Sequence, residues 1–343
     1  MRVAMYYNNR DVRLEKAPTP SIRPGELLMK IHSSGICGSD LMEWYRIHKA
    51  PLILGHETAG EVVEVGQGVE SFKKGDRIVA THHVPCFNCH YCRTDHETIC
   101  DTLLGRTRFE PGGFCEYTRL HAINVRSGTW KLPDDVSYDA GTFVEPLGCV
   151  LRGQSRAGLR PGATILVLGS GIAGLLHINL AAATGAGLII ATDINEHRLE
   201  SAKRFGADLA IHAGEDITSF IRKNNNGRGA DIVIICATAE PVFMQAFDAV
   251  ERGGTILIFA PTMEGVTIPL SINDLFWRRD VTITTTYAAS PSDCATALEL
   301  IARKRIKVED MITHRLGLKD TVEGFRLAAE AEKAIKIIIR PQE

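Results

Sequence analysis

Hydrophobic and polar positions follow one pattern in the first third of this 343-residue chain and a different pattern in its middle. Up to about residue 136, short apolar runs are separated by glycine turns such as Arg23-Pro24-Gly25. Runs of this length between turn residues are typical of β-strands, and their close spacing indicates a small barrel or a folded sheet. The strands predicted in this way are Arg2–Tyr6, Asp11–Ala17, Glu26–His32, Glu61–Val65 and one within residues 72–79.

From residue 163 the pattern changes to apolar runs that alternate with amphipathic stretches. Residues 195–206 and 240–251 have helical periodicity. This alternation predicts a doubly wound α/β domain with a parallel sheet, whose strands are buried on both faces. The predicted strands are Ile165–Leu168, Leu188–Thr192, Leu209–His212, Asp231–Cys236 and Thr255–Phe259.

The two patterns predict two domains, which agrees with a length above the roughly 250–300 residues that one core supports. A helical stretch at residues 137–157 separates the patterns. After residue 290, the helices at 291–303 and 319–331 and the strand Ile335–Ile339 do not continue the α/β repeat. We therefore expect one β-rich domain from residues 1–152 and 290–343, and a nucleotide-binding α/β domain from residues 153–289.

Charge and composition exclude several classes of protein. The net charge of −2 lacks the basic surface of a nucleic-acid binder, which excludes a zinc-finger protein of that kind. No window approaches the ~20 apolar residues that span a bilayer, so we expect no membrane association. The run Met1–Tyr7 lacks the apolar stretch of a secretion signal. We expect a cytoplasmic, reducing environment, in which clustered cysteines are metal ligands rather than disulfides.

Four of the nine cysteines lie within residues 86–100, and their spacing predicts a structural zinc site. Cys86, Cys89, Cys92 and Cys100 form the pattern C-x2-C-x2-C-x7-C. Four thiolates close a tetrahedral zinc site with no open position. An iron–sulfur cluster is disfavoured because the common bacterial run ends C-x3-C-P, whereas Asp101 follows Cys100. His90 and His96 are interpreted as surface residues.

A glycine-rich turn between a strand and a helix predicts a dinucleotide site. The turn has the pattern G-x-G-x-x-G, and an acidic residue follows about 20 positions later. Glycines allow the tight turn and the close approach of the pyrophosphate to the helix N-terminus. The carboxylate at position 193 favours NAD over NADP because it repels a 2′-phosphate, although Arg198 offers a phosphate partner. The predicted cofactor residues are Gly169, Gly171, Ile172, Ala173, Gly174, Asp193, Ile194 and Arg198.

A second metal site is predicted from the runs Cys37–Asp40 and Gly55–Glu57. A catalytic zinc takes three ligands from cysteine, histidine and carboxylate side chains and leaves one position open. Cys37 and His56 are the candidate pair, and a carboxylate completes the set.

Taken together, these residues resemble the zinc-dependent medium-chain dehydrogenase/reductase superfamily over the whole chain. The run from Gly55 to Val62 is similar to its G-H-E-x-x-G-x-V signature, and Phe143–Leu147 resembles the sorbitol (polyol) dehydrogenase branch. The resemblance implies a GroES-like catalytic domain, a Rossmann domain, an active site in the cleft between them, and a homodimer or homotetramer. It also implies that Glu57 or Glu145 acts near the catalytic zinc and that Ser39 passes on the alcohol proton.

One residue departs from the family pattern. The family commonly has histidine five residues after the zinc cysteine, where it ends a proton relay, but this chain has Met42. The relay must end earlier, in water, or at a neighbour such as His48. The following residues, Glu43–Arg46, also differ from a pocket for a small alcohol.

The expected reaction is reversible oxidation of a secondary alcohol, a polyol or sugar derivative, with one catalytic and one structural zinc per chain and NAD. The alternatives are a zinc dehydrogenase for an amino-acid side chain such as that of threonine, a zinc dehydrogenase for a phosphorylated polyol, and a non-catalytic NAD-binding protein. For the homo-oligomer, we predict pairing through an edge strand at Val266–Leu270, where Pro269 confines the strand to an edge.

Overall fold

The computed structural model describes the whole chain, Met1–Glu343, which divides into two compact units. The first unit contains residues 1–148 and 288–343, and the second contains residues 149–287. The sequence predicted these divisions at 152/153 and 289/290. No helix of either unit combines the length and the apolar composition that crossing a membrane requires.

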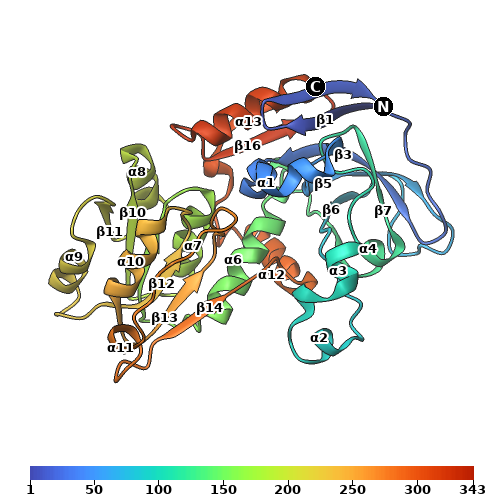
Figure 1. The fold of residues 1–343 in the computed structure, drawn as a ribbon. Helices are drawn as coiled ribbons and strands as arrows, with labels where there is room; N and C mark the ends of the chain where they lie inside the picture. Colours follow the sequence, from blue (N-terminus) through green and yellow to red (C-terminus); the bar gives the residue numbers. More distant parts are fainter. The chain divides into compact units, whose positions relative to one another are not determined.

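The first unit is built on a seven-stranded sheet in the order β15-β16-β3-β5-β6-β8, with β7 paired to β3 (Figure 1). The apolar positions of its central strands, such as Leu27, Met29 and Ile31 on β3, are fully buried. The C-terminal strand β16 pairs antiparallel with β3, so that Ile339 lies opposite Ser34. The strands are β3 (Leu27–Gly35), β5 (Glu57–Val65), β6 (Arg77–Ala80), β7 (Tyr117–Leu120), β8 (Thr129–Lys131), β15 (Ile312–Gly317) and β16 (Lys336–Arg340).

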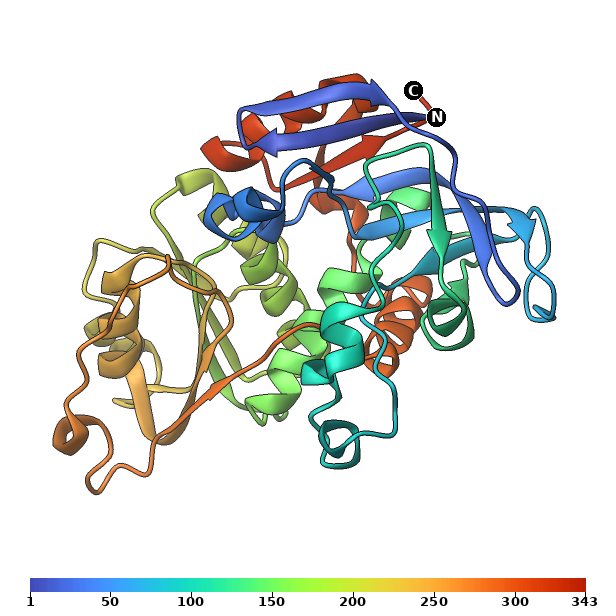
Figure 2. The same ribbon diagram turned by 45° about the vertical axis from the view of Figure 1, so that its right-hand side comes forward.

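A smaller sheet in the order β2-β1-β4 covers a second core of this unit. Its strands are β1 (Arg2–Asn8), β2 (Asp11–Lys16) and β4 (Leu52–Ile53). Figure 2 shows the hairpin β1–β2 beside α13 (Thr321–Glu330). The rings of Tyr6 and Phe325 join the two elements, with their centroids 5.9 Å apart.

Short helices connect the strands of the first unit, and α12 begins at a capping box in which Ser290 and Asp293 satisfy each other's backbone N–H groups. The helical stretch predicted at 137–157 forms two helices, α5 and α6, of which α6 continues into the second unit. The α-helices are α1 (Glu43–Arg46), α2 (His90–Arg93), α3 (Asp101–Gly105), α4 (Ala122–Ser127), α5 (Tyr138–Gly141), α6 (Val144–Arg156) and α12 (Pro291–Ala302). The 3₁₀ helices are η1 (Gly38–Leu41), η2 (Ile47–Lys49), η3 (Glu97–Ile99), η4 (Glu309–Met311) and η5 (Leu318–Asp320).

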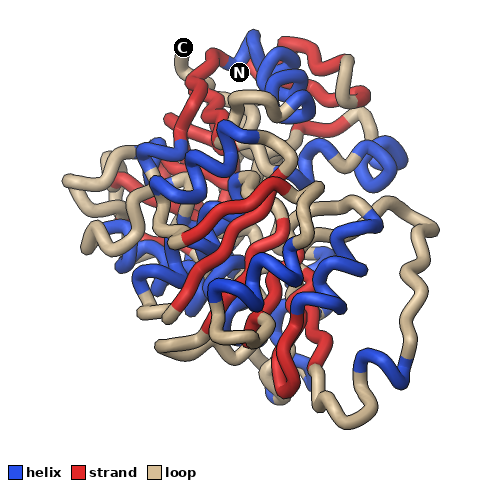
Figure 3. Tube along the Cα trace, turned by 90° about the vertical axis from the view of Figure 1, so that its left-hand side faces the viewer, coloured by secondary structure: helices blue, strands red, loops and turns tan.

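The second unit is a six-stranded parallel sheet in the order β11-β10-β9-β12-β13-β14. This is the strand order of the dinucleotide-binding fold, in which the turn after the first strand lies where the order reverses. In Figure 3 this unit faces the viewer, with its strands side by side and helices next to them. The strands are β9 (Thr164–Leu168), β10 (Leu188–Asp193), β11 (Leu209–His212), β12 (Ala230–Ile235), β13 (Val250–Ile258) and β14 (Thr282–Thr285). The helices are α7 (Ile172–Ala183), α8 (Glu196–Arg204), α9 (Ile217–Asn224), α10 (Glu240–Ala249) and α11 (Ile272–Leu275).

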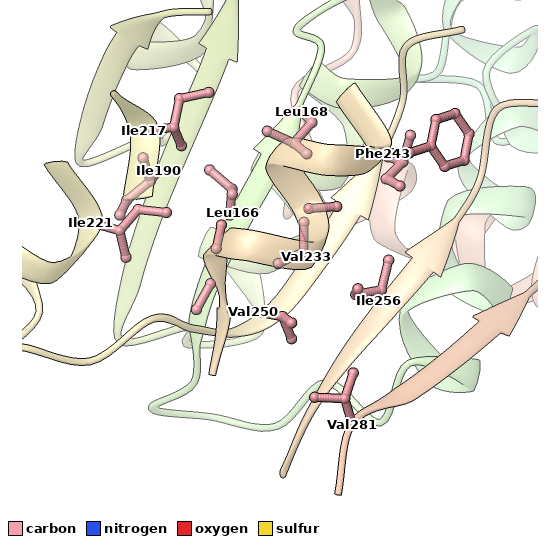
Figure 4. Packing of buried hydrophobic residues seen from close by; sticks show 14 of the residues in the cluster. Leu166, Leu168, Ile190, Ile217, Ile221, Val233, Phe243, Val250, Ile256 and Val281 are labelled. Atoms are coloured by element: carbon pink, nitrogen blue, oxygen red, sulfur yellow. The ribbon is translucent and has the colours of Figure 1, made fainter. Parts of the chain in front are cut away.

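The core on one side of this sheet comes from the apolar runs that the sequence predicts as strands. Leu166, Val233 and Ile256 of three neighbouring strands are fully buried, and Phe243 of α10 packs on them (Figure 4). The predicted fold class, a β-rich GroES-like domain with a Rossmann parallel-sheet domain, is confirmed.

The predicted edge strand at Val266–Leu270 is wrong. These residues form no strand, and the sheet ends instead at β14, which pairs parallel with β13. Pro269 has no N–H group to donate to a neighbouring strand. Ile268 packs against the core, so the alternating pattern reflects a loop that packs on the core of this unit rather than a strand.

Candidate metal centre and nucleotide site

Cys37, His56 and Glu57 meet because two paired strands end at the same place. In the antiparallel pair β3–β5, Gly35 lies opposite Glu57, so the residues just after β3 lie beside the first residue of β5. Cys37 precedes η1, and its Sγ atom, a ring nitrogen of His56 and a carboxylate oxygen of Glu57 all lie within 4.8 Å of one another. This soft-and-hard donor set fits zinc.

Asp40 holds His56 from behind, a role that sequence analysis did not assign. The carboxylate is fully buried, with its Oδ1 3.5 Å from His56 Nδ1, and its Oδ2 accepts a hydrogen bond from the backbone N–H of Cys37 at 3.1 Å. A carboxylate in this position orients an imidazole toward a metal. In the sequence, the acidic residue three positions after Cys37 could have indicated this role.

The local charges favour a cation at this site. Burial lowers the pKa of His56, but the charges of Asp40 and Cys37 outweigh it and raise that pKa well above its ordinary value. The same field that favours a proton on the imidazole favours a metal cation in its place.

Glu57 is held by a buried partner from the far end of the chain. Its carboxylate and the Lys336 ammonium form an ion pair in which both side chains are only 1% exposed. Lys336 also donates to the carbonyl oxygen of Ile36 at 3.1 Å. Burial raises the pKa of Glu57, and the Lys336 charge opposes this rise. The backbone at Gly35 leaves the room required, since a Cβ there would lie 2.1 Å from Glu57 Oε2.

Glu145 lies in a neighbouring group rather than in that of Cys37. Its carboxylate and the rings of His82 and His83 have ligand atoms within 4.8 Å of one another, and Glu145 Oε1 is 3.4 Å from His83 Nδ1. The ring of His82 is 5.0 Å from that of His56, so the two groups adjoin. Sequence analysis missed both histidines, an adjacent pair that follows β6 after Thr81.

Ser39 contacts both the metal site and a cation. Its Oγ lies 3.5 Å from Cys37 Sγ, and Arg46 donates to that Oγ at 3.3 Å and to the Ser39 carbonyl oxygen at 3.0 Å. Arg46 therefore occupies the hydroxyl's outer side. His48, the relay end that the sequence left open, is exposed and has no bond to Ser39.

The four cysteines of residues 86–100 come together as the sequence predicted. Cys92 Sγ lies 3.9 Å from Cys86 Sγ and 3.5 Å from Cys89 Sγ. Four sulfurs at 2.3 Å from one zinc would be separated by about 3.8 Å, so the cluster has the size of a tetrahedral site. Burial raises the pKa of the Cys100 thiol, but backbone N–H donors, that of Cys86 first, outweigh it and lower the pKa to about 6.

The three glycines of the nucleotide turn have separate reasons to lack a side chain. Gly169 has a φ of +97°, which only glycine adopts readily. A Cβ on Gly174 would lie 1.9 Å from the carbonyl oxygen of Gly169, so this glycine allows α7 to pack on the turn. A Cβ on Gly171 would meet only Arg198 Nη1, at 3.9 Å, so this position leaves room for a pyrophosphate. Ile172 and Ala173 open α7, whose N-terminal N–H groups suit an anion.

Asp193 ends β10 and bonds to the turn. Its Oδ2 accepts from the N–H of Ser170 at 2.8 Å and lies 3.8 Å from Arg198 Nη1, and its Oδ1 accepts from the N–H of Asn195 at 3.0 Å. Ile194 is 77% exposed beside it. The predicted cofactor residues thus lie together at the carboxyl end of the sheet.

Two family models match the chain. Residues 23–134 match the alcohol dehydrogenase GroES-like domain, and residues 173–303 match the zinc-binding dehydrogenase domain. The sorbitol dehydrogenase of Gallus gallus is 31% identical over 340 residues, which cover 96% of this chain and 93% of the relative. The sorbitol dehydrogenase of Bacillus subtilis (strain 168) is 31% identical over 99% of this chain and 97% of its own length.

The chain belongs to the zinc-dependent medium-chain dehydrogenase family.

Solved structures of zinc-type dehydrogenases have the same fold. The alcohol dehydrogenase TADH from Thermus sp. ATN1 has a TM-score of 0.88 at 28% identity and covers 99% of both chains. A zinc-binding dehydrogenase from Sinorhizobium meliloti 1021, bound to NADP, has a TM-score of 0.86 at 25% identity, also over 99% of both chains. The present dehydrogenase is therefore an alcohol or polyol dehydrogenase, with Arg46 beside the hydroxyl of Ser39.

Proposed function

We propose that this dehydrogenase reversibly oxidises a polyol or a related secondary alcohol, with NAD as the hydride acceptor. The observation that carries the proposal is the Cys37–His56–Glu57 donor group with the Ser39 hydroxyl beside it. The sorbitol dehydrogenases among its relatives support the substrate class. The chain would hold one zinc ion at this group and one at the four cysteines.

Each residue around the Cys37–His56–Glu57 group has a separate role in the proposed reaction. Zinc held there would supply a Lewis acid that lowers the pKa of an alcohol hydroxyl. Ser39 Oγ is placed to accept the proton that the alcohol loses while its own proton passes to solvent water, because Arg46 can only donate to this oxygen. Arg46 donates to the same oxygen and stabilises any negative charge that develops on it. Asp40 and Lys336 keep His56 and Glu57 in place.

The choice of NAD rests on Asp193. NAD accepts a hydride at its nicotinamide ring when it is held by a fold of this type. A carboxylate at the end of the second strand accepts hydrogen bonds from the ribose hydroxyls and repels a 2′-phosphate. Because the dehydrogenase from Sinorhizobium meliloti binds NADP, the coenzyme must be inferred from this chain's own residues.

The test is the rate of NAD and NADP reduction by zinc-loaded enzyme over a panel of primary alcohols, secondary alcohols, polyols and threonine. We expect the highest kcat/KM with a polyol and NAD. Asp193→Ala should lower the ratio of kcat/KM with NAD to that with NADP about tenfold or more, while Glu196→Ala, an exposed carboxylate on α8, should leave it unchanged. Equal or better turnover of NADP by the unmodified enzyme would overturn the coenzyme assignment.

We also propose that the protein is a homodimer or homotetramer that pairs through β14. This strand ends the sheet, and an uncovered edge favours pairing with a second copy. Light scattering at micromolar concentration should give a mass of at least twice 37.6 kDa, and a mass near 37.6 kDa would rule the pairing out.

A further inference from the structure

Two cationic side chains lie against the ring of Tyr45 in the first unit. The Lys49 ammonium lies 3.7 Å from the centre of the Tyr45 ring, and Arg46 Cζ lies 4.8 Å from it. Arg108, from the segment after α3, acts on the same ring. A hydrogen bond from Lys49 lowers the pKa of the Tyr45 phenol, and the charges of Arg46 and Arg108 lower it further.

This cationic group, Arg46, Lys49 and Arg108, adjoins the metal site. Arg46 Nη2 is one hydrogen bond from Ser39 Oγ, which is itself one hydrogen bond from Cys37 Sγ. Burial lowers the pKa of His82 well below its ordinary value, and the charges of Arg46 and Arg108 lower it further. The Arg46 guanidinium therefore lies close to the ligands of the predicted zinc.

The positive charge of the group is not balanced by nearby carboxylates. Lys49 and Arg108 are exposed and form no ion pair. Asp40 lies 3.9 Å from Arg46, but its carboxylate is buried and already contacts His56 and the Cys37 N–H. Glu43, on the helix that carries Arg46, accepts a hydrogen bond from the backbone of Asn9 instead.

Arg46 keeps part of its hydrogen-bonding capacity. Its Nε and Nη2 bond to Ser39, while its Nη1 group has no partner in the protein. A guanidinium matches the geometry of carboxylate and phosphate oxygens, and a lysine adds charge without a fixed direction. A neutral polyol would leave Lys49 and Arg108 without a counter-charge.

We propose that the substrate of this dehydrogenase is a hydroxylated compound that carries an oxyanion, either a carboxylate or a phosphate, which Arg46, Lys49 and Arg108 bind while the reacting hydroxyl lies at Cys37, His56 and Glu57. This inference rests on the proposed oxidation of a polyol and narrows its substrate class. Cations lining one side of a site also raise the local concentration of an anionic substrate, an effect that salt weakens.

The test compares D-sorbitol, D-gluconate and D-sorbitol 6-phosphate as substrates of the zinc-loaded enzyme with NAD, together with their binding measured by calorimetry. We expect KM for one of the two anionic compounds to be at least tenfold below that for D-sorbitol and to rise with salt. Preference for D-gluconate assigns a carboxylate, and preference for the phosphate ester assigns a phosphate.

Variants connect this preference to the residues. Lys49→Gln and Arg108→Gln should each lower the ratio of kcat/KM for the preferred anion to that for D-sorbitol about tenfold, the loss expected from one charged hydrogen bond. Lys74→Gln removes an exposed cation elsewhere in the first unit and should leave the ratio unchanged. Calorimetry should show the same order of affinities.

The two ways to fail are distinct. If D-sorbitol is oxidised with a KM equal to or below that of both anions, or if the ratio is insensitive to both variants, this inference is wrong and the proposed polyol oxidation stands. If none of the three compounds, and no other polyol, reduces NAD, the proposed function fails and this inference fails with it.

Discussion

The two groups proposed to hold zinc are assembled in opposite ways. The four cysteines of residues 86–100 lie within one short loop, and each position needs only tight local turns. Cys37, His56 and Glu57 come instead from the adjoining ends of two strands, and Lys336, 279 residues from Glu57, completes their surroundings. The first group offers four identical ligands, whereas the second offers three and depends on the fold of the whole first unit.

This difference predicts that the two groups fail differently when a ligand is lost. Cys37→Ser should lower kcat/KM by about 1000-fold or more, because a Lewis acid contributes several kcal/mol to catalysis, with little change in the free energy of unfolding. Cys100→Ser should remove a zinc ion and lower the free energy of unfolding by roughly 3 kcal/mol or more, because a structural site couples metal binding to folding. Zinc content, chemical denaturation and kinetics of both variants check this. Equal loss of stability in the two variants would contradict the distinction.

The buried ion pair offers a second way to test the assembled group. Lys336→Met leaves the Glu57 carboxylate buried without a partner, which should lower the free energy of unfolding by about 3–5 kcal/mol. Adding Glu57→Gln should restore part of that loss. Lys333→Met, three residues earlier and exposed, is the matched control. If urea denaturation gives the same stability for Lys336→Met and Lys333→Met, Lys336 does not support the site.

The sequence predicted the local group better than the assembled one for a physical reason. The spacing C-x2-C-x2-C-x7-C constrains which sulfurs can meet, since fifteen residues allow few arrangements. The ion pair of Glu57 with Lys336 depends on the pairing of β16 with β3, and no local pattern encodes it. Glu145, expected near the catalytic zinc, lies in the group of His82 and His83, which adjoins His56. The family resemblance predicted the region in which Glu145 lies but not the residues that it contacts.

The strands, too, were predicted well where the evidence is local in the sequence and poorly where it depends on distant residues. The strands at Ile165–Leu168 and Leu209–His212 were predicted within a residue, because a short apolar run marks each of them. The sheet edge was misassigned since Val266–Leu270 alternates as an edge strand would, while Thr282–Thr285 is short and polar. β14 pairs with β13 because of the path that the chain takes between them, and the periodicity of apolar residues carries no information on that path.

The attachment of β16 predicts a smaller, pH-dependent effect. Asp139 accepts from Arg340 of β16 at 2.8 Å, from Arg315 of β15 at 2.6 Å and from Ser33 at 2.6 Å. Burial raises the pKa of Asp139, but these three partners outweigh it and lower the pKa below its ordinary value. A carboxylate with a lowered folded-state pKa stabilises the fold above its unfolded pKa, and this contribution is lost as the pH falls through its folded-state pKa.

Asp139→Asn should therefore cost on the order of 1 kcal/mol at pH 7 and less as the pH falls below about 4. Urea denaturation between pH 7 and pH 3 measures the difference between the variant and the unmodified protein. The exposed Asp134→Asn is the control and should follow the unmodified protein at each pH. A difference that stays constant across this range would show that the Asp139 charge does not hold β16.

Zinc content before and after mild chelation tests the contrast between the two groups most directly. The untreated, active enzyme should contain two zinc ions per chain. Brief treatment with a chelator should leave one zinc, abolish NAD reduction and preserve the circular dichroism spectrum, because the group at Cys37 has an open position and the four-cysteine group does not. A single zinc ion per chain in the untreated, fully active enzyme would contradict the account.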